Sequence, residues 1–332
     1  MNIKKAKNSL KSVARTTVIV SMHKAIDNCR RNNPTKKPEE PDYVAALVLD
    51  GTKILEKGWS EVLNKYGISL SITGIYCHQS PMLNYSGMSG KCCEIGDLLW
   101  CHFHRQQNGE YLNNAILFQA KKISRFPYKL LSSEMDQYNL YYKWPKFEYT
   151  RPEKLKNQIR HVTPSSPRRG AQYLTIDENS PGLQGQPKEY PCKTCLSINP
   201  LVYHNDLGKE LTNSLGFLTG DMFDFPSSKD DWSKVICDLI QIAEDSLMNR
   251  LRSGYKNHRR IAGFAPSQLQ GCISMSQNNP SRILSSFLSK SDYDSLINLN
   301  NEAQPNWRNT DNYFDEDGGI STIIVETAES EG

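Results

Sequence analysis

The sequence has 332 residues, of which 38% are hydrophobic and 23% are charged, and its formal net charge is +4. This composition excludes disordered and fibrous proteins, and the chain is long enough to bury a sizeable core. Its longest apolar runs, such as 45–49, are far shorter than the roughly 18 residues of a membrane span. No apolar stretch of signal-peptide length follows the basic first residues, so we expect a cytoplasmic protein without a membrane partner. The 9 cysteines, an odd number, are expected to be reduced thiols.

The charge is unevenly distributed along the chain. Residues 1–40 contain ten basic and three acidic side chains, whereas residues 311–331 are acidic. Pro34, Pro38 and Pro41 are typical of a linker. We therefore expect residues 1–42 to form a basic arm or weakly amphipathic helix and a Pro-rich linker, which would contact nucleic acid through its phosphates.

The hydrophobic pattern predicts an α+β core over residues 43–150. Apolar positions recur at helical spacing up to Tyr66, with a break near Asp50, and Gly67 ends the pattern. Asn108-Gly109 is a hairpin signal between two of the strands that follow. The strands are expected at 68–76, 93–104 and 115–120, and a further helix at 132–142. These elements would form a mixed sheet flanked by helices.

The residues that carry chemistry lie at the ends of two of these strands. Asp97 precedes an apolar strand, and Gln119-Ala120-Lys121 ends the strand about twenty residues later. Side chains alternate along a strand, so Gln119 and Lys121 share one face. A carboxylate holds a hard cation, and a nearby ammonium stabilises the charge of a phosphoryl transition state. The sequence therefore predicts a site that hydrolyses phosphodiester bonds.

The combination of Asp97 with Gln119-Ala120-Lys121 resembles the PD-(D/E)xK nuclease superfamily, in the Q-x-K form of Mrr-type restriction endonucleases. The resemblance covers residues 43–145 and implies a restriction-endonuclease-like core. It also implies Mg²⁺ or Mn²⁺ held by Asp97, Gln119 and a glutamate of the preceding helix, with Lys121 as the catalytic lysine. It further implies an endonuclease that acts on DNA in restriction or phage defence, as a homodimer or with partner proteins of a defence system.

Two glutamates of the predicted first helix could complete the metal site. Glu56 lies beside the apolar stripe that includes Trp59, whereas Glu61 lies far around the helix on a charged face. We therefore expect Glu56 to be the ligand. Glu94 is a third candidate, because Gly96 permits a bulge that would direct its side chain toward Asp97.

Gln119 is a neutral ligand where a carboxylate would bind the ion more tightly, so a second interpretation stays open. The chain would then be a catalytically silent nucleic-acid-binding protein or an interaction subunit of a multi-protein system. Metal binding distinguishes the two interpretations.

Residues 151–332 are expected to form a large mixed accessory region that binds substrate, senses a signal or binds a partner. An amphipathic helix is predicted over 232–251. A basic patch at and beyond its end would contact phosphates, or would be a solvated helix end whose cations complement the helix dipole. It consists of Arg250, Arg252, Lys256, Arg259 and Arg260.

Two further motifs have either a functional or an ordinary structural interpretation. Cys192 and Cys195 form half of a zinc-binding pattern, and without a second half we expect thiols rather than zinc ligands. His102 and His104 would face the cleft as proton carriers, or lie as ordinary polar residues at a strand end.

Overall fold

The computed structural model describes residues 3–32, 34–78, 80–163, 169–177, 179–180, 190–226, 230–253, 273–274, 281–283, 290 and 319–330. The helices are α1 (Ile3–Asn32), α2 (Glu40–Ala46), η1 (Leu47–Gly51), α3 (Thr52–Leu63), η2 (Asn64–Tyr66), η3 (Ser132–Glu134), α4 (Met135–Lys143), α5 (Leu207–Leu215) and α6 (Asp231–Ser253). The strands are β1 (Ile68–Ile75), β2 (Met82–Tyr85), β3 (Cys93–Glu94), β4 (Leu98–Arg105), β5 (Tyr111–Ile123), β6 (Phe147–Arg151), β7 (Ile159–Arg160), β8 (Ala171–Asp177), β9 (Cys192–Leu196), β10 (Tyr203–Asp206), β11 (Asp221–Met222), β12 (Ile273–Ser274) and β13 (Ser321–Glu329).

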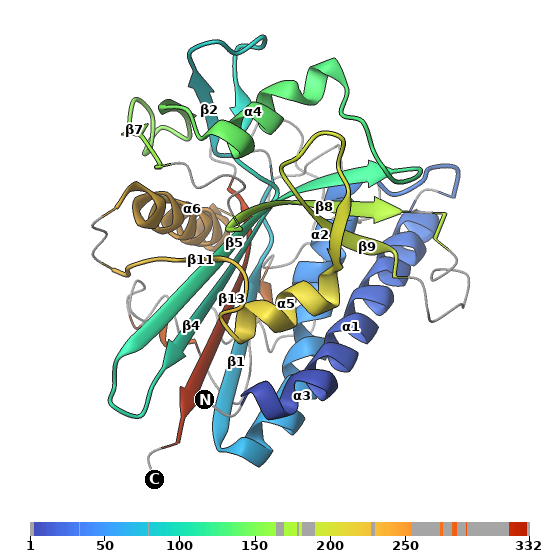
Figure 1. The fold of residues 1–332 in the computed structure, drawn as a ribbon, viewed down its shortest axis with the longest axis vertical. Helices are drawn as coiled ribbons and strands as arrows, with labels where there is room; N and C mark the ends of the chain where they lie inside the picture. Colours follow the sequence, from blue (N-terminus) through green and yellow to red (C-terminus); the bar gives the residue numbers. More distant parts are fainter. Residues whose placement is uncertain are drawn as a thin grey trace.

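One large mixed sheet forms the centre of the described part of the chain. Its strand order is β10-β9-β8-β5-β4-β13-β1-β12, and β11 pairs with β5. Strand β13 lies between β4 and β1, parallel to β4 and antiparallel to β1 (Figure 1). Strands β5 and β8 are also parallel, whereas β4 and β5 form the antiparallel hairpin that Asn108-Gly109 predicts. The α+β class with a mixed sheet flanked by helices is therefore confirmed.

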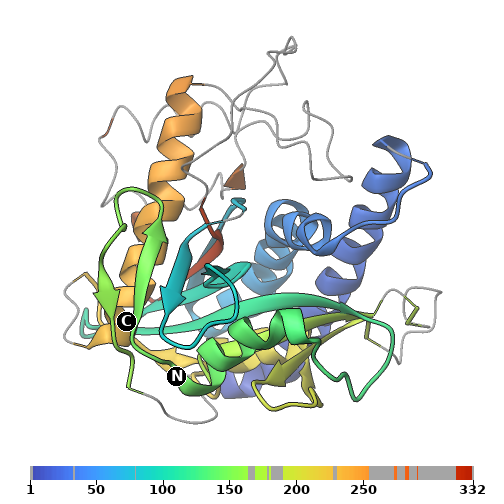
Figure 2. The same ribbon diagram turned by 90° about the horizontal axis from the view of Figure 1, so that it is seen from above.

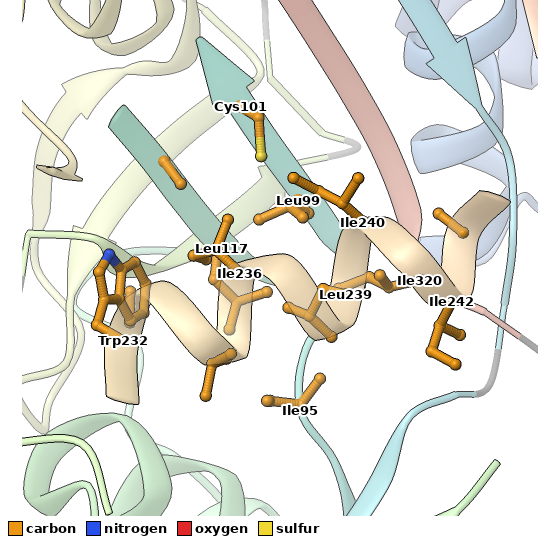
Figure 3. Packing of buried hydrophobic residues seen from close by; sticks show 14 of the residues in the cluster. Ile95, Leu99, Cys101, Leu117, Trp232, Ile236, Leu239, Ile240, Ile242 and Ile320 are labelled. Carbon is orange, nitrogen blue, oxygen red and sulfur yellow. The ribbon is translucent and has the colours of Figure 1, made fainter. Parts of the chain in front are cut away.

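The two faces of the sheet bury separate cores. Helices α1, α3 and α5 cover one face, where Leu98, Trp100 and Phe118 are buried. Helix α6 covers the other face, and Figure 2 shows it opposite the N-terminal helices. Trp232, Ile236 and the following apolar residues of α6 pack on Leu99 and Leu117 (Figure 3). A second sheet, of order β3-β2-β6-β7, contributes to this same core together with α4.

The helix predicted from Tyr43 to Tyr66 is present, and its break is a change of helix type. Five residues, Leu47–Gly51, form a π-helical turn between α2 and α3. The sheet approaches this turn closely, because a Cβ atom on Gly74 of β1 would lie 2.1 Å from the Val48 carbonyl oxygen. Only glycine permits that approach.

Residues 1–42 are not a basic arm, and this expectation is wrong for the described part. Helix α1 buries Leu10, Ala14 and Val18 in the core with α3 and α5. The Trp59 indole donates a hydrogen bond of 2.9 Å to the Leu10 carbonyl oxygen. Lys5, Lys24 and Arg30 of this helix are exposed, whereas Arg15 pairs with Asp206 at the start of α5. No helix within the described residues has the length and apolarity that crossing a membrane requires.

The boundary expected at residue 151 does not separate two cores. Strands β8, β9, β10, β11 and β13 all belong to the sheet that contains β1, β4 and β5. Helix α6 matches the prediction over 232–251, but it packs on the central strands and not on a separate accessory region. The expected division at 150/151 therefore has to be corrected, because residues on both sides of it share one sheet.

Truncation of Leu10 tests the buried role of α1. Leu10 is fully buried, so Leu10→Ala should lower the free energy of unfolding by roughly 2–5 kcal/mol. Lys24→Ala, at an exposed position of the same helix, should change it by less than about 0.5 kcal/mol. Urea unfolding followed by circular dichroism measures both, and equal stabilities of the two variants would show that α1 does not pack as described.

Candidate active site

Asp97 lies immediately before β4, against the part of β5 that carries Gln119 and Lys121. Its backbone amide donates a hydrogen bond of 2.9 Å to the Phe118 carbonyl oxygen. The Ala120 amide donates in return to Asp97 Oδ2 at 2.7 Å, and Gln119 Nε2 donates to the same oxygen. The carboxylate is thus held between the two strands, and the structure brings Asp97 and the Gln-Ala-Lys triplet together.

Glu94 shares this site with Asp97. The two carboxyl groups lie close enough for each to shift the pKa of the other. Burial, followed by the negative charge of Glu94, raises the pKa of Asp97 well above its usual range. Burial also raises the pKa of Glu94, although the interaction with Asp97 and the charges of Arg151 and Lys121 oppose this shift. The pair therefore lies in a region that favours additional positive charge.

The link between Glu94 and Asp97 passes through a tightly packed glycine. A Cβ atom on Gly96 would lie 2.7 Å from the Tyr141 hydroxyl and 2.8 Å from Leu117 Cδ1. The same hydroxyl donates a hydrogen bond of 2.9 Å to the Ile95 carbonyl oxygen. Gly96 is thus required for the close packing of residues 95–96 on β5 and α4. This packing fixes the short segment between Glu94 and Asp97.

The polar face of β5 is covered by η3 and α4. Gln137 Nε2 donates a hydrogen bond of 2.5 Å to Gln119 Oε1. Lys121 Nζ lies 3.3 Å from Glu134 Oε1, with both side chains mostly buried. Glu134 and Gln137 are three residues apart on a helical segment, and Lys121 and Gln119 are two residues apart on β5. Both separations are about 5–7 Å, so the two pairs of side chains can meet. In this arrangement the Gln119 amide nitrogen faces Asp97, so Gln119 orients the carboxylate.

The upstream helical carboxylate whose charge acts on Asp97 is Glu40. Its charge is among those that raise the pKa of Asp97, and its Oε1 accepts a hydrogen bond of 3.0 Å from the Lys122 amide. Glu40 begins α2, and Pro41 occupies one of the first helical positions, where it favours helix initiation. Glu56 is half-buried on α3, which packs on α1 and β1, and its role as a ligand stays a prediction.

The donor set fits a divalent cation that needs few protein ligands. Among the described residues, no group of three or more His, Cys, Asp or Glu side chains is arranged to hold a metal ion. Asp97 and Glu94 nevertheless provide two adjacent, partly buried carboxylates. Mg²⁺ is usually bound through one or two carboxylates and keeps several waters, so Asp97 and Glu94 are the residues that would hold such an ion here.

His102 and His104 lie on the opposite face of β4 from Leu99 and away from Asp97. Both side chains are buried, and each ring nitrogen facing β13 lies 2.8 Å from Thr327 Oγ1. His102 also packs on Phe217, with ring centroids 5.0 Å apart. Residue 102 is roughly 16 Å along the strand from residue 97. Of the two alternatives, a position facing the cleft is therefore wrong, and both histidines are buried polar residues of β4.

Cys192 and Cys195 point to opposite faces of β9. Cys192 belongs to the core under α1, with its Sγ 3.2 Å from Met22 Sδ, whereas Cys195 belongs to the core under α6. Two thiols on opposite faces of one strand cannot ligate the same ion. Among the basic residues of the predicted patch, Arg250 and Arg252 belong to the last turns of α6, and Lys256, Arg259 and Arg260 lie outside the described residues.

A comparison of the chain with protein-family models, with curated proteins and with solved structures gives no match. The interpretation of the site therefore depends on its own geometry.

Three polar contributors were not predicted from the sequence, namely Glu40, Glu134 and Gln137. The sequence around Glu40 carries the signal of a helix start, because Pro41 follows it and the acidic Asp42 lies three positions after Glu39. In the structure the Glu39 amide donates a hydrogen bond of 2.8 Å to Asp42, as in a capped helix start. Glu134 and Gln137 had the spacing of one helical face, but no local pattern indicates which strand that face covers.

The buried histidines predict a pH dependence of stability. Burial, followed by the charge of His104, lowers the pKa of His102 to about 3, while Glu329 acts on His104 in the opposite direction. Below pH 6.5 the unfolded chain therefore binds a proton at residue 102 that the folded chain does not bind. The contribution of His102 to the free energy of unfolding is therefore complete above pH 6.5. It falls as the pH drops, by up to about 1.4 kcal/mol per pH unit.

His102→Gln should remove this contribution. Urea unfolding between pH 7 and pH 4 should show a smaller loss of unfolding free energy for the variant than for the parent, whatever their difference at pH 7. Parallel pH dependences of the unfolding free energy in the parent and the variant would mean that His102 binds its proton equally in the folded and unfolded states.

Proposed function

We propose that the chain is a divalent-metal-dependent nuclease with a restriction-endonuclease-like core. The observation that carries this proposal is the Asp97 carboxylate held by the Ala120 amide, with Gln119 bonded to it and Lys121 on the same face of β5. This is the juxtaposition that the Asp and Gln-x-Lys pattern requires. Glu94 and Glu40 add the negative charge that a cation site needs.

Hydrolysis of a phosphodiester forms a bond from a water oxygen to phosphorus and breaks the bond to the leaving oxygen, which takes up a proton. A bound Mg²⁺ or Mn²⁺ would supply Lewis acidity and a more acidic water. Asp97 and Glu94 would hold that ion, and Gln119 would keep the Asp97 carboxylate in place. Lys121 would stabilise the charge on the phosphoryl oxygens, with Glu134 positioning its ammonium group.

The proposal extends to the substrate and the biological setting only through the resemblance. DNA as substrate, a cytoplasmic location, and a role in restriction or phage defence with a homodimer or partner proteins belong to this proposal. They are separate from the geometry that supports phosphodiester chemistry.

One observation favours a second candidate, a catalytically silent nucleic-acid-binding or interaction subunit. The Lys121 ammonium is paired with Glu134, and the Gln119 nitrogen, not its oxygen, faces Asp97. In that arrangement the cluster could serve only to lock β4 on β5. Metal binding separates the candidates: a melting temperature that rises with Mg²⁺ or Mn²⁺ in the parent but not in Asp97→Asn supports the nuclease.

Cleavage assays on Asp97→Asn and Lys121→Ala test the reaction itself. Asp97→Asn should abolish metal-dependent cleavage of circular DNA, linear DNA or RNA, because an amide replaces the carboxylate ligand. Lys121→Ala should slow cleavage by roughly 10²-fold to 10³-fold, the scale of one lost electrostatic contact in a transition state. Lys65→Ala, at an exposed position of η2, is the matched control and should cleave like the parent. Cleavage by both site variants at the parental rate, with EDTA-sensitive activity, would place the site elsewhere.

A comparison of Glu40→Gln with Glu56→Gln determines which helix completes the site. Glutamine keeps an acceptor for the Lys122 amide but removes the charge that acts on Asp97. Glu40→Gln should therefore weaken the apparent affinity for Mg²⁺ in cleavage by roughly 10-fold or more, while Glu56→Gln should change it less. The reverse order would identify Glu56 as the helical ligand, and the roles proposed for Asp97 and Lys121 would not change.

A further inference from the structure

A group of two aromatic rings and one lysine lies at the edge of the large sheet, on β9, β10 and the loop after β5. Lys193 Nζ is 5.2 Å from the ring centroid of Phe126 and 5.2 Å from that of Tyr203. The two ring centroids are 5.9 Å apart, with an angle of 65° between the planes. The Tyr203 side chain is 56% exposed, so one ring of the group is open to solvent. We call Phe126, Lys193 and Tyr203 the aromatic platform.

Strand register places the aromatic platform close to Lys121. Lys121 of β5 pairs with Thr175 of β8, and Thr175 pairs with Lys193 of β9. The buried neighbours Tyr173 and Cys195 assign Thr175 and Lys193 to the same face of the sheet as Lys121. Lys121 and Lys193 are therefore separated by two strand spacings, or about 10 Å.

The loop that carries Phe126 is anchored to the segment before Tyr203. Tyr128 and Leu201 exchange two backbone hydrogen bonds, of 3.0 and 2.7 Å. The same loop joins the aromatic platform to the candidate active site, because the Tyr128 hydroxyl donates to Glu134, the partner of Lys121. The aromatic platform thus has fixed supports on both sides.

The charges around the aromatic platform fit a polyanion. Arg125 and Lys129 are exposed on the loop that carries Phe126. Aromatic rings interleaved with cations bind bases by stacking and phosphates by charge. A stacking ring needs a free base face, which an intact duplex does not offer.

We propose that the aromatic platform binds an unpaired base of a single-stranded nucleic acid, with the adjoining phosphates near Lys193 and Arg125. This proposal rests on the proposed function for the position of the cleaved bond, which would lie near Lys121, two strand spacings or about 10 Å from Lys193. It assigns to β9, β10 and the loop after β5 a substrate-binding role that the Asp and Gln-x-Lys site does not require.

Binding measured without metal tests the aromatic platform separately from cleavage. The probes are a fluorescein-labelled single-stranded DNA of about 15 nucleotides, the RNA of the same sequence and the corresponding DNA duplex, followed by fluorescence anisotropy in EDTA. The parent should bind a single strand more tightly than the duplex. Comparison of the DNA and RNA arms identifies which kind of strand is preferred.

Tyr203→Ala should weaken single-strand binding by roughly 5-fold to 100-fold, because a stacking contact contributes about 1–3 kcal/mol. Tyr203→Phe, which keeps the ring, should bind like the parent. Tyr111→Ala, which removes a 47% exposed ring at the other end of β5, is the matched control and should also bind like the parent. Lys193→Gln should reduce the slope of log affinity against log salt by about 0.7.

Three outcomes would overturn the proposal: no oligonucleotide binding by the parent, equal binding by Tyr203→Ala and the parent, or an unchanged salt slope in Lys193→Gln. The proposed function fails separately, because a parent that binds the single strand in EDTA but cleaves nothing with Mg²⁺ or Mn²⁺ would retain the aromatic platform and lose the nuclease.

Discussion

The position of strand β13 is the constraint on which the candidate site depends. This strand pairs along its length with β4 on one side and with β1 on the other, and its first five residues are buried. Leu98, which follows Asp97, pairs with Ser321 of β13 and with Phe118 of β5. The backbone at Asp97 is therefore fixed from both neighbouring strands. A side-chain contact between β4 and β13, from His102 to Thr327, spans 225 residues of sequence, so the pairing of these strands requires closure of a very long loop.

A purely structural role would not require the charges that surround Asp97. Its hydrogen bond from the Ala120 amide could be accepted equally well by an asparagine oxygen. Instead, Glu94 and Glu40 both raise the pKa of Asp97. Lys121 is already paired with a further carboxylate, Glu134. Burial of excess like charge costs stability, and proteins retain such costs mainly where a ligand or reaction needs the charge. This imbalance is the physical argument for a cation site over a simple lock between strands.

The sequence predicted the local parts of this site and failed where partners come from distant segments. Strand alternation placed Gln119 and Lys121 on one face, and the turn at Asn108-Gly109 paired their strand with the one after Asp97, because both signals lie within a few residues. No local pattern indicates that β13 separates β1 from β4. The buried face of helix α1 was not predicted because cations dominate the composition of this segment, although Leu10 and Ala14 already have the spacing of such a face.

The arrangement of the aromatic platform relative to Lys121 follows from the opposite face of the same strands. Ala120, Leu174 and Cys192, from β5, β8 and β9, are all buried in the core beneath α1 and α5. Because this core fixes the three strands, the spacing between Lys121 and Lys193 is set by backbone pairing and not by side-chain conformation. A strand of nucleic acid with a phosphate at Lys193 would therefore meet Lys121 at a fixed interval. The number of nucleotides between the bound phosphate and the cleaved bond would then be determined by the pairing of the strands.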